Sequence, residues 1–262
     1  MNFQELKGKV ALVTGGAQGI GRTLVESLAT QGVKVAVVDY NEEQLNLQIK
    51  RFKEQGVEVF AFPADVGDSI AVDAIVEEVE RKIGPIEMLV NVAGILSSGP
   101  IQSFSDQDWA RTFSINTTGV FNVSRAVSRY MVRREKGTIV TVGSNAASVP
   151  RISMAAYAAS KAATVMFTKC LGLELAEHGI RCNIVSPGST DTDMQRSLWT
   201  DDNGAEMMIK GMPDSFKVGI PLKKIAQPQN IVSAILFFLS EQSSHITMSN
   251  LVVDGGATLG AS

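Results

Sequence analysis

Short apolar segments alternate along the chain with segments of helical spacing. The apolar segments are nearly continuous in Val, Ile, Leu and Ala, which is typical of strands covered on both faces. They predict strands at Lys9–Val13, Val33–Asp39, Val57–Phe62, Ile86–Asn91, Thr138–Gly143, Ile180–Ser186 and Asn250–Val253. Apolar residues spaced three and four apart predict helices at Ile20–Thr30, Glu42–Glu54, Ser69–Lys82, Asp106–Arg133, Met154–Glu177 and Pro228–Ser240.

This repeated order of strand and helix predicts an α/β fold with a doubly wound parallel sheet of about seven strands and helices on both faces. No low-complexity tract, repeat or linker divides the 262 residues, so we expect a single domain over 1–262. One segment, 188–220, is polar and only weakly periodic. It follows the sixth strand, and ligands bind at the carboxyl edge of such sheets, so we interpret it as a substrate lid.

Composition narrows the partners. The hydrophobic fraction is 45%, the charged fraction 19% and the net charge −3. No excess of basic charge is available to neutralise phosphates, which argues against nucleic acid or an anionic membrane surface as partner. Met1–Val10 has no apolar signal core, and no apolar stretch approaches the ~20 residues of a spanning helix. We therefore expect a cytoplasmic protein.

The two cysteines and two histidines carry no recognisable site. Cys170 and Cys182 lack the Cys-x-x-Cys spacing of a redox or zinc site, and they suit buried positions in a reducing cytoplasm. His178 and His245 lie far in the sequence from the motifs described below. We assign them no role and expect no metal.

A glycine-rich turn follows the first strand, in the run Thr14–Gly21. Glycine allows the backbone to turn tightly and to approach a pyrophosphate, and the helix that opens at Gly19 directs its N–H groups at that anion. The turn is weak evidence by itself, because many strand–helix junctions need glycine. The candidate phosphate-binding residues are Gly15, Gln18, Gly19, Ile20 and Gly21.

Asp39 ends the second predicted strand, twenty residues after Gly19. A carboxylate there accepts hydrogen bonds from the adenosine ribose and repels a 2′-phosphate. No Arg or Lys occupies positions 15 to 21 to attract that phosphate, so the sequence favours NAD over NADP. The alternative is that Asp39 merely caps the following helix.

The strongest chemical signal is Tyr157 with Lys161, and Ser144 thirteen residues upstream of Tyr157. Tyr157 and Lys161 are four residues apart in a predicted helix and share one face. Oxidation of an alcohol needs a base, and a free tyrosine, with a pKa of about 10, is too weakly acidic near neutrality. An ammonium ~4 Å away supplies roughly the 3–4 kcal/mol needed to lower that pKa by ~2–3 units. We expect Lys161 to do so, while Ser144 holds the substrate oxygen.

These pieces together resemble the short-chain dehydrogenase family over essentially the whole chain. The spacing Gly-x-x-x-Gly-x-Gly is the family's variant of the glycine turn. Tyr-x-x-x-Lys alone occurs often by chance, but here it coincides with the glycine turn, the upstream Ser and a helix Asn. The resemblance implies a Rossmann-type fold and gives catalytic roles to Asn116, Ser144, Tyr157 and Lys161, with Asn116 anchoring a water in the proton path. It also implies cofactor contacts by Asp65, Val66, Asn91, Ala93, Gly94, Tyr157, Lys161, Pro187, Gly188 and Thr190.

Four further runs resemble family members that oxidise a carboxylated cyclohexadiene diol in catecholate siderophore synthesis. These runs are Ser186–Arg196, Pro150–Ile152, Gly219–Leu222 and Val253–Gly260. In such enzymes NAD oxidises one ring hydroxyl, and the ketone then tautomerises to an aromatic catechol acid.

Such a substrate needs a cation at its carboxylate. Arginine suits a planar carboxylate, and Arg151 and Arg196 are the candidates. The alternative for either Arg is an ion pair with a surface acid such as Asp193 or Asp201. Met154, Gln195 and Met194 are expected to shape the pocket. The substrate residues are therefore predicted as Ser144, Arg151, Met154, Tyr157, Gln195 and Arg196.

Three other functions remain open on the sequence. A reductase of 3-oxoacyl thioesters shares the core motifs but usually prefers NADP, against which Asp39 weighs. A non-catalytic nucleotide-binding module tends to lose the catalytic Tyr or Lys, and both are present here. A dehydrogenase of another cyclic alcohol is the third. The family resemblance also implies a homotetramer formed through the fourth and fifth helices and the carboxyl terminus.

Overall fold

Seven parallel strands form a single sheet in the computed structural model, which describes residues 3–199 and 203–261. The strand order is β3-β2-β1-β4-β5-β6-β7. Successive strands are added towards one edge from β1 to β3 and towards the other edge from β4 to β7, so the order reverses between the parallel neighbours β1 and β4. The strands are β1 Val10–Thr14, β2 Lys34–Asp39, β3 Val59–Pro63, β4 Ile86–Asn91, β5 Gly137–Val142, β6 Ile180–Pro187 and β7 Asn250–Val253. The predicted doubly wound parallel sheet is confirmed.

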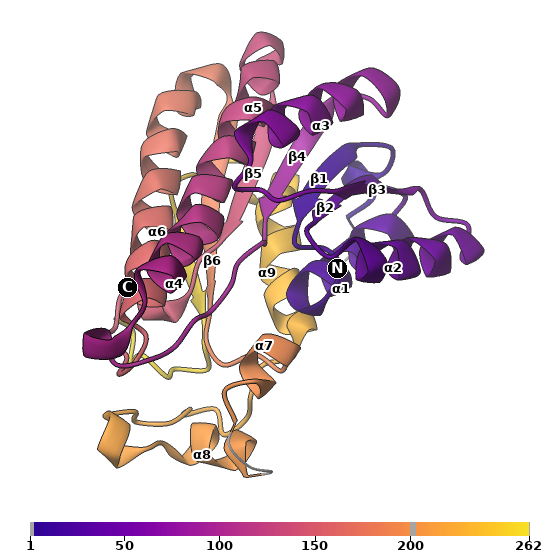
Figure 1. The fold of residues 1–262 in the computed structure, drawn as a ribbon. Helices are drawn as coiled ribbons and strands as arrows, with labels where there is room; N and C mark the ends of the chain where they lie inside the picture. Colours follow the sequence, from indigo (N-terminus) through magenta and orange to yellow (C-terminus); the bar gives the residue numbers. More distant parts are fainter. Residues whose placement is uncertain (1–2, 200–202, 262) are drawn as a thin grey trace.

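Helices cover both faces of this sheet (Figure 1). In β1, Ala11 and Val13 pack against the layer of α1, α2 and α9, whereas Val10 and Leu12 pack against α3, α5 and α6. This alternation is the period of two that a strand imposes on its side chains. In the described ranges the helices are α1 Gly19–Thr30, α2 Glu42–Glu54, α3 Ser69–Lys82, α4 Asp106–Phe113, α5 Val120–Arg134, α6 Ala155–Leu175, α7 Asp193–Arg196, α8 Gly204–Lys210 and α9 Pro228–Leu239.

The predicted boundaries agree with these elements within about two residues, with one exception. The helix expected at Asp106–Arg133 is observed over 106–134, but a π-helical turn, Ser114–Gly119, interrupts it and separates α4 from α5. Within this turn the side chain of Asn116 bonds both main-chain groups of Ile95, at 2.8 and 2.9 Å. The Thr164 hydroxyl donates to the main-chain oxygen of Asn116 at 2.7 Å. These tertiary bonds provide partners for an interrupted helix, and helical spacing does not reveal them.

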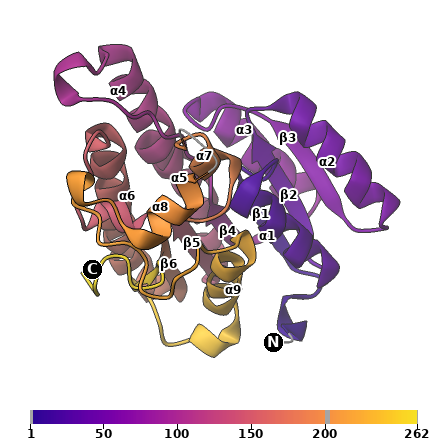
Figure 2. The same cartoon turned by 90° about the horizontal axis from the view of Figure 1, so that it is seen from below.

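The segment predicted as a lid contains α7 and α8. It leaves β6 and lies beyond the helical layers in Figure 1, in orange, and Figure 2 shows it crossing the end of the sheet near β4 to β6. Its return is tied to the carboxyl-terminal loop by a hydrogen bond from Leu222 N to Gly255 O of 3.1 Å. None of the described helices is both long and apolar enough to cross a membrane.

Candidate active site

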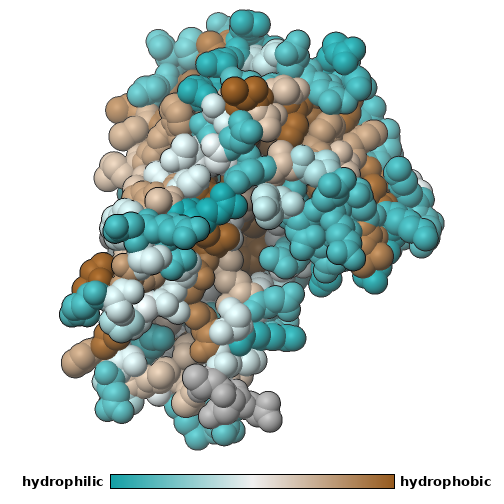
Figure 3. All heavy atoms as spheres, viewed as in Figure 1, coloured by the Kyte–Doolittle hydropathy of each residue, from teal (hydrophilic) through white to brown (hydrophobic). Residues whose placement is uncertain are grey.

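A cavity of about 550 Å³ lies at the carboxyl edge of the sheet, between the strand ends and the α7–α8 segment. Its wall includes residues that follow β1, β2, β3, β4, β5 and β6. Figure 3 shows the surface hollowed near the centre of this view, with apolar residues in brown inside the hollow and hydrophilic residues in teal around it. Ligand sites of parallel α/β sheets occupy this same edge, where the strand order reverses.

The glycine turn forms one end of the cavity. Gly15 has φ +69°, and a Cβ at Gly21 would lie 1.9 Å from the main-chain oxygen of Gly15, so no larger residue fits at position 21. Helix α1 begins at Gly19, and the side chain of Gln18 does not cap it. The first-turn N–H groups of α1 therefore have no side-chain cap at the cavity, which is the arrangement that binds phosphate. Gly15, Gln18, Gly19, Ile20 and Gly21 all line this wall.

Asp39, at the end of β2, lies beside this turn in the cavity wall. Its carboxylate accepts from Ala17 N at 2.9 Å and from Asn41 N at 3.0 Å. Helix α2 is capped by Asn41, whose side chain accepts from Gln44 N. The alternative interpretation of Asp39 as the cap of this helix is therefore wrong. Its carboxylate instead braces the glycine turn and borders the cavity.

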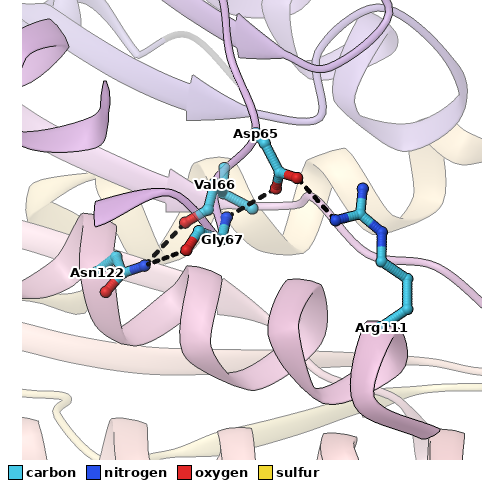
Figure 4. Close-up of polar contacts among 5 residues, drawn as sticks. All are labelled: Asp65, Val66, Gly67, Arg111 and Asn122. Carbon is cyan, nitrogen blue, oxygen red and sulfur yellow. Dashed lines mark hydrogen bonds and ion pairs between the residues drawn. The ribbon is translucent and has the colours of Figure 1, made fainter. Parts of the chain in front are cut away.

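Asp65 and Val66 follow β3 and form the next part of the wall (Figure 4). Asp65 accepts from Gly67 N at 2.8 Å and pairs with the guanidinium of Arg111 at 2.7 Å. Burial raises the pKa of Asp65, but the hydrogen bonds from Arg111 and Gly67 outweigh it and hold that pKa below its usual range. The main-chain oxygen of Val66 accepts from Asn122 on α5, at 3.0 Å.

Arg111, which the sequence analysis missed, links three parts of this wall. Its guanidinium lies 5.6 Å from the ring centre of Tyr40 and also pairs with Asp65. Both of these residues line the cavity with it. An Arg on an amphipathic helix carries no signal in the sequence, because only the fold brings α4 next to β2 and β3.

Ser144, Tyr157 and Lys161 meet deeper in the cavity. Tyr157 and Lys161 project from the first two turns of α6, and Ser144 follows β5. The Ser144 hydroxyl accepts from Ala146 N at 3.1 Å and is hydrogen-bonded to the Tyr157 hydroxyl. The Lys161 amino group donates to the main-chain oxygen of Val142 at 2.9 Å. The structure thus brings together the three residues that the sequence spacing singled out.

The electrostatics of this cluster differ from the expectation. Burial raises the pKa of Tyr157, and the hydrogen bond with Ser144 offsets only part of that rise. Burial also lowers the pKa of Lys161, to about 8. Lys161 lies 5.9 Å from the Tyr157 ring centre and is bonded to main chain. The expected lowering of the Tyr157 pKa by Lys161 is therefore wrong for these contacts, because burial penalises both charged forms.

The cofactor residues predicted at the later strand ends largely reach the cavity. Ala93, Gly94, Pro187, Gly188 and Thr190 line it. Asn91 is not among the lining residues. It is buried at the end of β4, where its amide donates to the Ser124 hydroxyl at 3.0 Å.

Asn116 is likewise fully buried and does not line the cavity. Its amide donates to the Ser160 hydroxyl at 3.0 Å, besides its bonds to Ile95. It therefore joins α6, which carries Tyr157 and Lys161, to the loop after β4.

Five of the six predicted substrate residues line the cavity: Arg151, Met154 and Gln195, besides Ser144 and Tyr157, and Met194 joins them. Arg196 does not line it, because its guanidinium pairs with Asp191 at 2.8 Å and its side chain is 56% exposed. The expectation of a substrate contact at Arg196 is thereby corrected in favour of the surface ion pair.

The partner of Arg196 also differs from the acids named as alternatives. It is Asp191 rather than Asp193, and Asp201 lies outside the described residues. Lys217, Met208 and Met212, which the sequence analysis did not single out, complete this end of the cavity.

A parallel sheet with a glycine turn at its reversal point, and a buried Tyr–Lys–Ser cluster beside it, defines a nicotinamide-dependent alcohol oxidoreductase. The chain belongs to the short-chain dehydrogenase family, whose model matches residues 9–203.

The chain is 62% identical over 260 residues to the 2,3-dihydro-2,3-dihydroxybenzoate dehydrogenase of Bacillus subtilis. The matched region covers 99% of this chain and 100% of the Bacillus subtilis enzyme. The enzyme of the same name from Escherichia coli is 43% identical, and the matched region covers 98% of this chain and 100% of that enzyme. A gluconate 5-dehydrogenase from Burkholderia cenocepacia, solved with NADP and tartrate, has a TM-score of 0.90 and 33% identity, and it covers 99% of this chain and 98% of its own.

Proposed function

We propose that the protein oxidises 2,3-dihydro-2,3-dihydroxybenzoate to 2,3-dihydroxybenzoate with NAD, in the synthesis of a catecholate siderophore. The observation that carries the proposal is one cavity in which Ser144 and Tyr157 lie with the cation Arg151. A hydroxyl and a carboxylate on the same small ring need such a pair of sites. The full-length likeness to the dehydrogenases of Bacillus subtilis and Escherichia coli supports the same substrate.

In this proposal Ser144 holds the substrate hydroxyl and Tyr157 removes its proton. The bound cofactor supplies a hydride acceptor, and its positively charged ring favours the Tyr157 phenolate. The substrate carbon that bears this hydroxyl loses a hydride as its C–O bond becomes a carbonyl. A ring proton then moves to the carbonyl oxygen by tautomerisation, which restores aromaticity and draws the reaction towards product.

Lys161 is proposed to hold the nicotinamide ribose and to pass on the proton that Tyr157 takes. Its amino group is fixed by Val142 O, and its pKa of about 8 allows it to exchange a proton near neutrality. Asn116 is proposed to anchor the water of this proton path and to keep α6 in register with the loop after β4, through its bonds to Ile95 and Ser160.

Asp39 is proposed to select NAD. Its carboxylate borders the cavity beside the glycine turn, where it repels a 2′-phosphate. The neighbour from Burkholderia cenocepacia, of nearly the same fold, was solved with NADP. A shared fold therefore does not by itself decide which of the two cofactors is bound.

The remaining cofactor contacts are proposed to follow the cavity wall. The turn at Gly15, Gln18, Gly19, Ile20 and Gly21 suits the pyrophosphate, and Asp65 and Val66 suit the adenine ring. Ala93, Gly94, Pro187, Gly188 and Thr190 border the remaining part. The α7–α8 segment, within 188–220, is proposed to act as the lid over the substrate.

We also propose a cytoplasmic homotetramer. The two cysteines are free thiols, which suits a reducing compartment. Cys182 is buried as expected, whereas Cys170 is exposed, so the expectation of a buried position is wrong for Cys170. Apolar side chains exposed on the helices named by the family resemblance support the assembly.

The test is the formation of NADH by purified protein with NAD and 2,3-dihydro-2,3-dihydroxybenzoate, with 2,3-dihydroxybenzoate measured in parallel. Equal amounts of both products are expected, together with weak or no turnover with NADP. Turnover only of other cyclic alcohols, or of 3-oxoacyl thioesters, would leave the family but reject this substrate. Binding of NAD without any turnover would reject the enzyme.

A further inference from the structure

The lid carries a second cation, Lys217, into the cavity that contains Arg151. Among the described residues, neither of these two side chains forms an ion pair with a carboxylate or a hydrogen bond that satisfies its charge. Lys217 is half-buried, whereas most unpaired lysines are solvated. Two unpaired cations in one half-enclosed space indicate an anion as the missing partner.

The backbone around Lys217 fixes its position. Its main-chain N–H and oxygen bond Met212 at 3.1 and 2.8 Å, and Ile220 N donates to Ile209 O at 2.9 Å. The neck of this loop needs glycine at 211 and 219, because a Cβ at either position would lie 2.6 or 2.5 Å from an opposing main-chain oxygen. The backbone of Lys217 is therefore held in place by a hydrogen-bonded loop and is not part of an unrestrained segment.

The local field is positive. Burial lowers the pKa of Lys217, and the charge of Arg151 lowers it further. Burial also lowers the pKa of Arg151, against which the charge of Asp254 acts only in part. Asp254 itself accepts four hydrogen bonds, from Gly256 N, from the N–H and hydroxyl of Thr258 and from the Asn145 amide. Its negative charge is thus already engaged.

The surroundings of the two cations suit a small ring. Met154 and Met212 are hydrogen-bonded through the main chain to Arg151 and Lys217, and with Met208 and Ile220 they line the same cavity and offer an apolar, adaptable surface. An aromatic or diene ring would contact these side chains while its acidic group meets the cations. A phosphate-bearing chain would not need this apolar surface.

We propose that Lys217 and Arg151 together form the subsite for the substrate carboxylate, and that Lys217 makes the enzyme selective for a carboxylated ring. This inference rests on the proposed function. Arg151 offers two parallel hydrogen bonds to a planar carboxylate, whereas Lys217 adds a point charge from the lid side.

The test is equilibrium binding of 2,3-dihydroxybenzoate and of catechol, which lacks the carboxylate, to the protein with NAD present. The wild-type protein is expected to prefer 2,3-dihydroxybenzoate about ten- to a hundredfold, the value of a charged hydrogen bond. Lys217→Met is expected to lose most of this preference, and Lys217→Arg to restore part of it. Lys210→Met, on α8 of the same segment, removes a 73% exposed lysine and should behave as wild type.

Kinetics separate recognition from chemistry. Lys217→Met is expected to raise KM for the carboxylated diol by a similar factor with little change in kcat, because the cation binds ground and transition states alike. Thermal unfolding at the wild-type temperature would show that the variant is folded, and Lys217→Gln provides a second variant if it is not.

The outcomes distinguish the two proposals. If the wild-type protein turns over the diol and Lys217→Met keeps the full preference for the carboxylated ligand, the subsite is rejected while the function stands. If the wild-type protein binds catechol as well as 2,3-dihydroxybenzoate, no carboxylate subsite exists. If it neither binds the acid nor turns over the diol, the proposed function is rejected, and the subsite that rests on it is rejected as well.

Discussion

At the scale of single residues, the proposed chemistry depends on the partly buried phenol of Tyr157. Tyr157 is hydrogen-bonded to Ser144 and burial raises its pKa, so the phenolate that is proposed to take the substrate proton must be stabilised locally. A general base of this kind contributes about 10²- to 10⁴-fold to a rate. Loss of the hydroxyl removes that contribution but no main-chain contact.

Tyr157→Phe is therefore expected to lower kcat by about 10²- to 10⁴-fold while leaving the Kd for NAD near the wild-type value. NADH formation and NAD binding by fluorescence measure the two quantities. Tyr130→Phe provides the control, because Tyr130 lies outside the cavity lining and stacks with Arg133. Retained turnover in Tyr157→Phe would remove Tyr157 as the base.

Lys161 makes stability depend on pH. Its pKa is about 8 in the folded protein, against 10.5 for the ordinary side chain. Between these values the unfolded chain binds more protons than the folded one, so the free energy of unfolding rises with pH across this window. We expect wild type to gain about 2 kcal/mol relative to Lys161→Met between pH 7.5 and 9.5.

Urea unfolding of both proteins at the two pH values measures this gain. Lys210→Met, which removes an exposed lysine, should follow wild type at both values. Parallel behaviour of wild type and Lys161→Met would mean that burial does not perturb the Lys161 pKa.

Asp39 is expected to set the cofactor ratio. Asp39→Ala should lower kcat/KM with NAD by about ten- to a hundredfold, the loss of a charged hydrogen bond, and raise the relative use of NADP. Asp39→Asn keeps an oxygen for Ala17 N–H and removes only the charge. If the ratio of kcat/KM with NAD to kcat/KM with NADP falls in both variants, the negative charge of Asp39 selects the cofactor. An unaltered ratio counts against a contact of Asp39 with the ribose.

At the scale of elements, two irregular segments position the site. The π-helical turn Ser114–Gly119 places Asn116 between the loop after β4 and α6, and the neck between Gly211 and Gly219 holds Lys217. The neck depends on close approaches between main-chain atoms, and the π turn is a departure from regular α-helical geometry that is accompanied by the tertiary bonds of Asn116. A change in either backbone should therefore affect substrate binding before it affects the fold.

Gly219→Ala tests the neck. Gly219 has φ +88°, where a Cβ costs ~1–2 kcal/mol, and that Cβ would also lie 2.5 Å from Ile209 O. We expect KM for the diol to rise several-fold more than kcat falls, because the neck opens and Lys217 moves. Gly56→Ala is the matched control, with φ +72° and open space around it. It should lose stability only, and an equal KM in both variants would contradict the role of the neck.

At the scale of the whole molecule, apolar side chains remain exposed on α4, α5 and α6. Trp109 and Phe121 are 41% and 40% exposed, and Met166 and Leu173, seven residues apart on one face of α6, are 59% and 70% exposed. Phe121 packs edge-on against Phe167, so α5 and α6 present a joint surface. Such a surface on a monomer is typical of a protein interface, which supports the proposed homotetramer.

Leu173→Arg is expected to convert the tetramer to smaller species, because it buries an unpaired charge in the interface. Light scattering with size-exclusion chromatography measures the mass, which for wild type should be about four times that of the chain. Ile70→Arg, on α3 and 81% exposed, should leave the mass unchanged. A monomeric wild-type protein would reject the assembly.

The sequence by itself determined the sheet and the main chemistry. Strands buried on both faces are continuous in Val, Ile, Leu and Ala, so β4 and β7 were predicted at their observed bounds. Ser144, Tyr157 and Lys161 were predictable because a local spacing of four on a helix, next to a strand end, decides their meeting.

Only the tertiary structure decided the contacts between distant elements. The π turn at Asn116, the ion pair of Arg196 with Asp191 and the approach of Arg111 to Asp65 depend on partners that sequence spacing does not specify. Burial, which lowers the pKa of Lys161 and raises that of Tyr157, is likewise a property of the packed chain. Local periodicity determines whether a segment forms a helix or a strand. The neighbours of that segment in space determine which charged groups it contacts and how far burial shifts their pKa values.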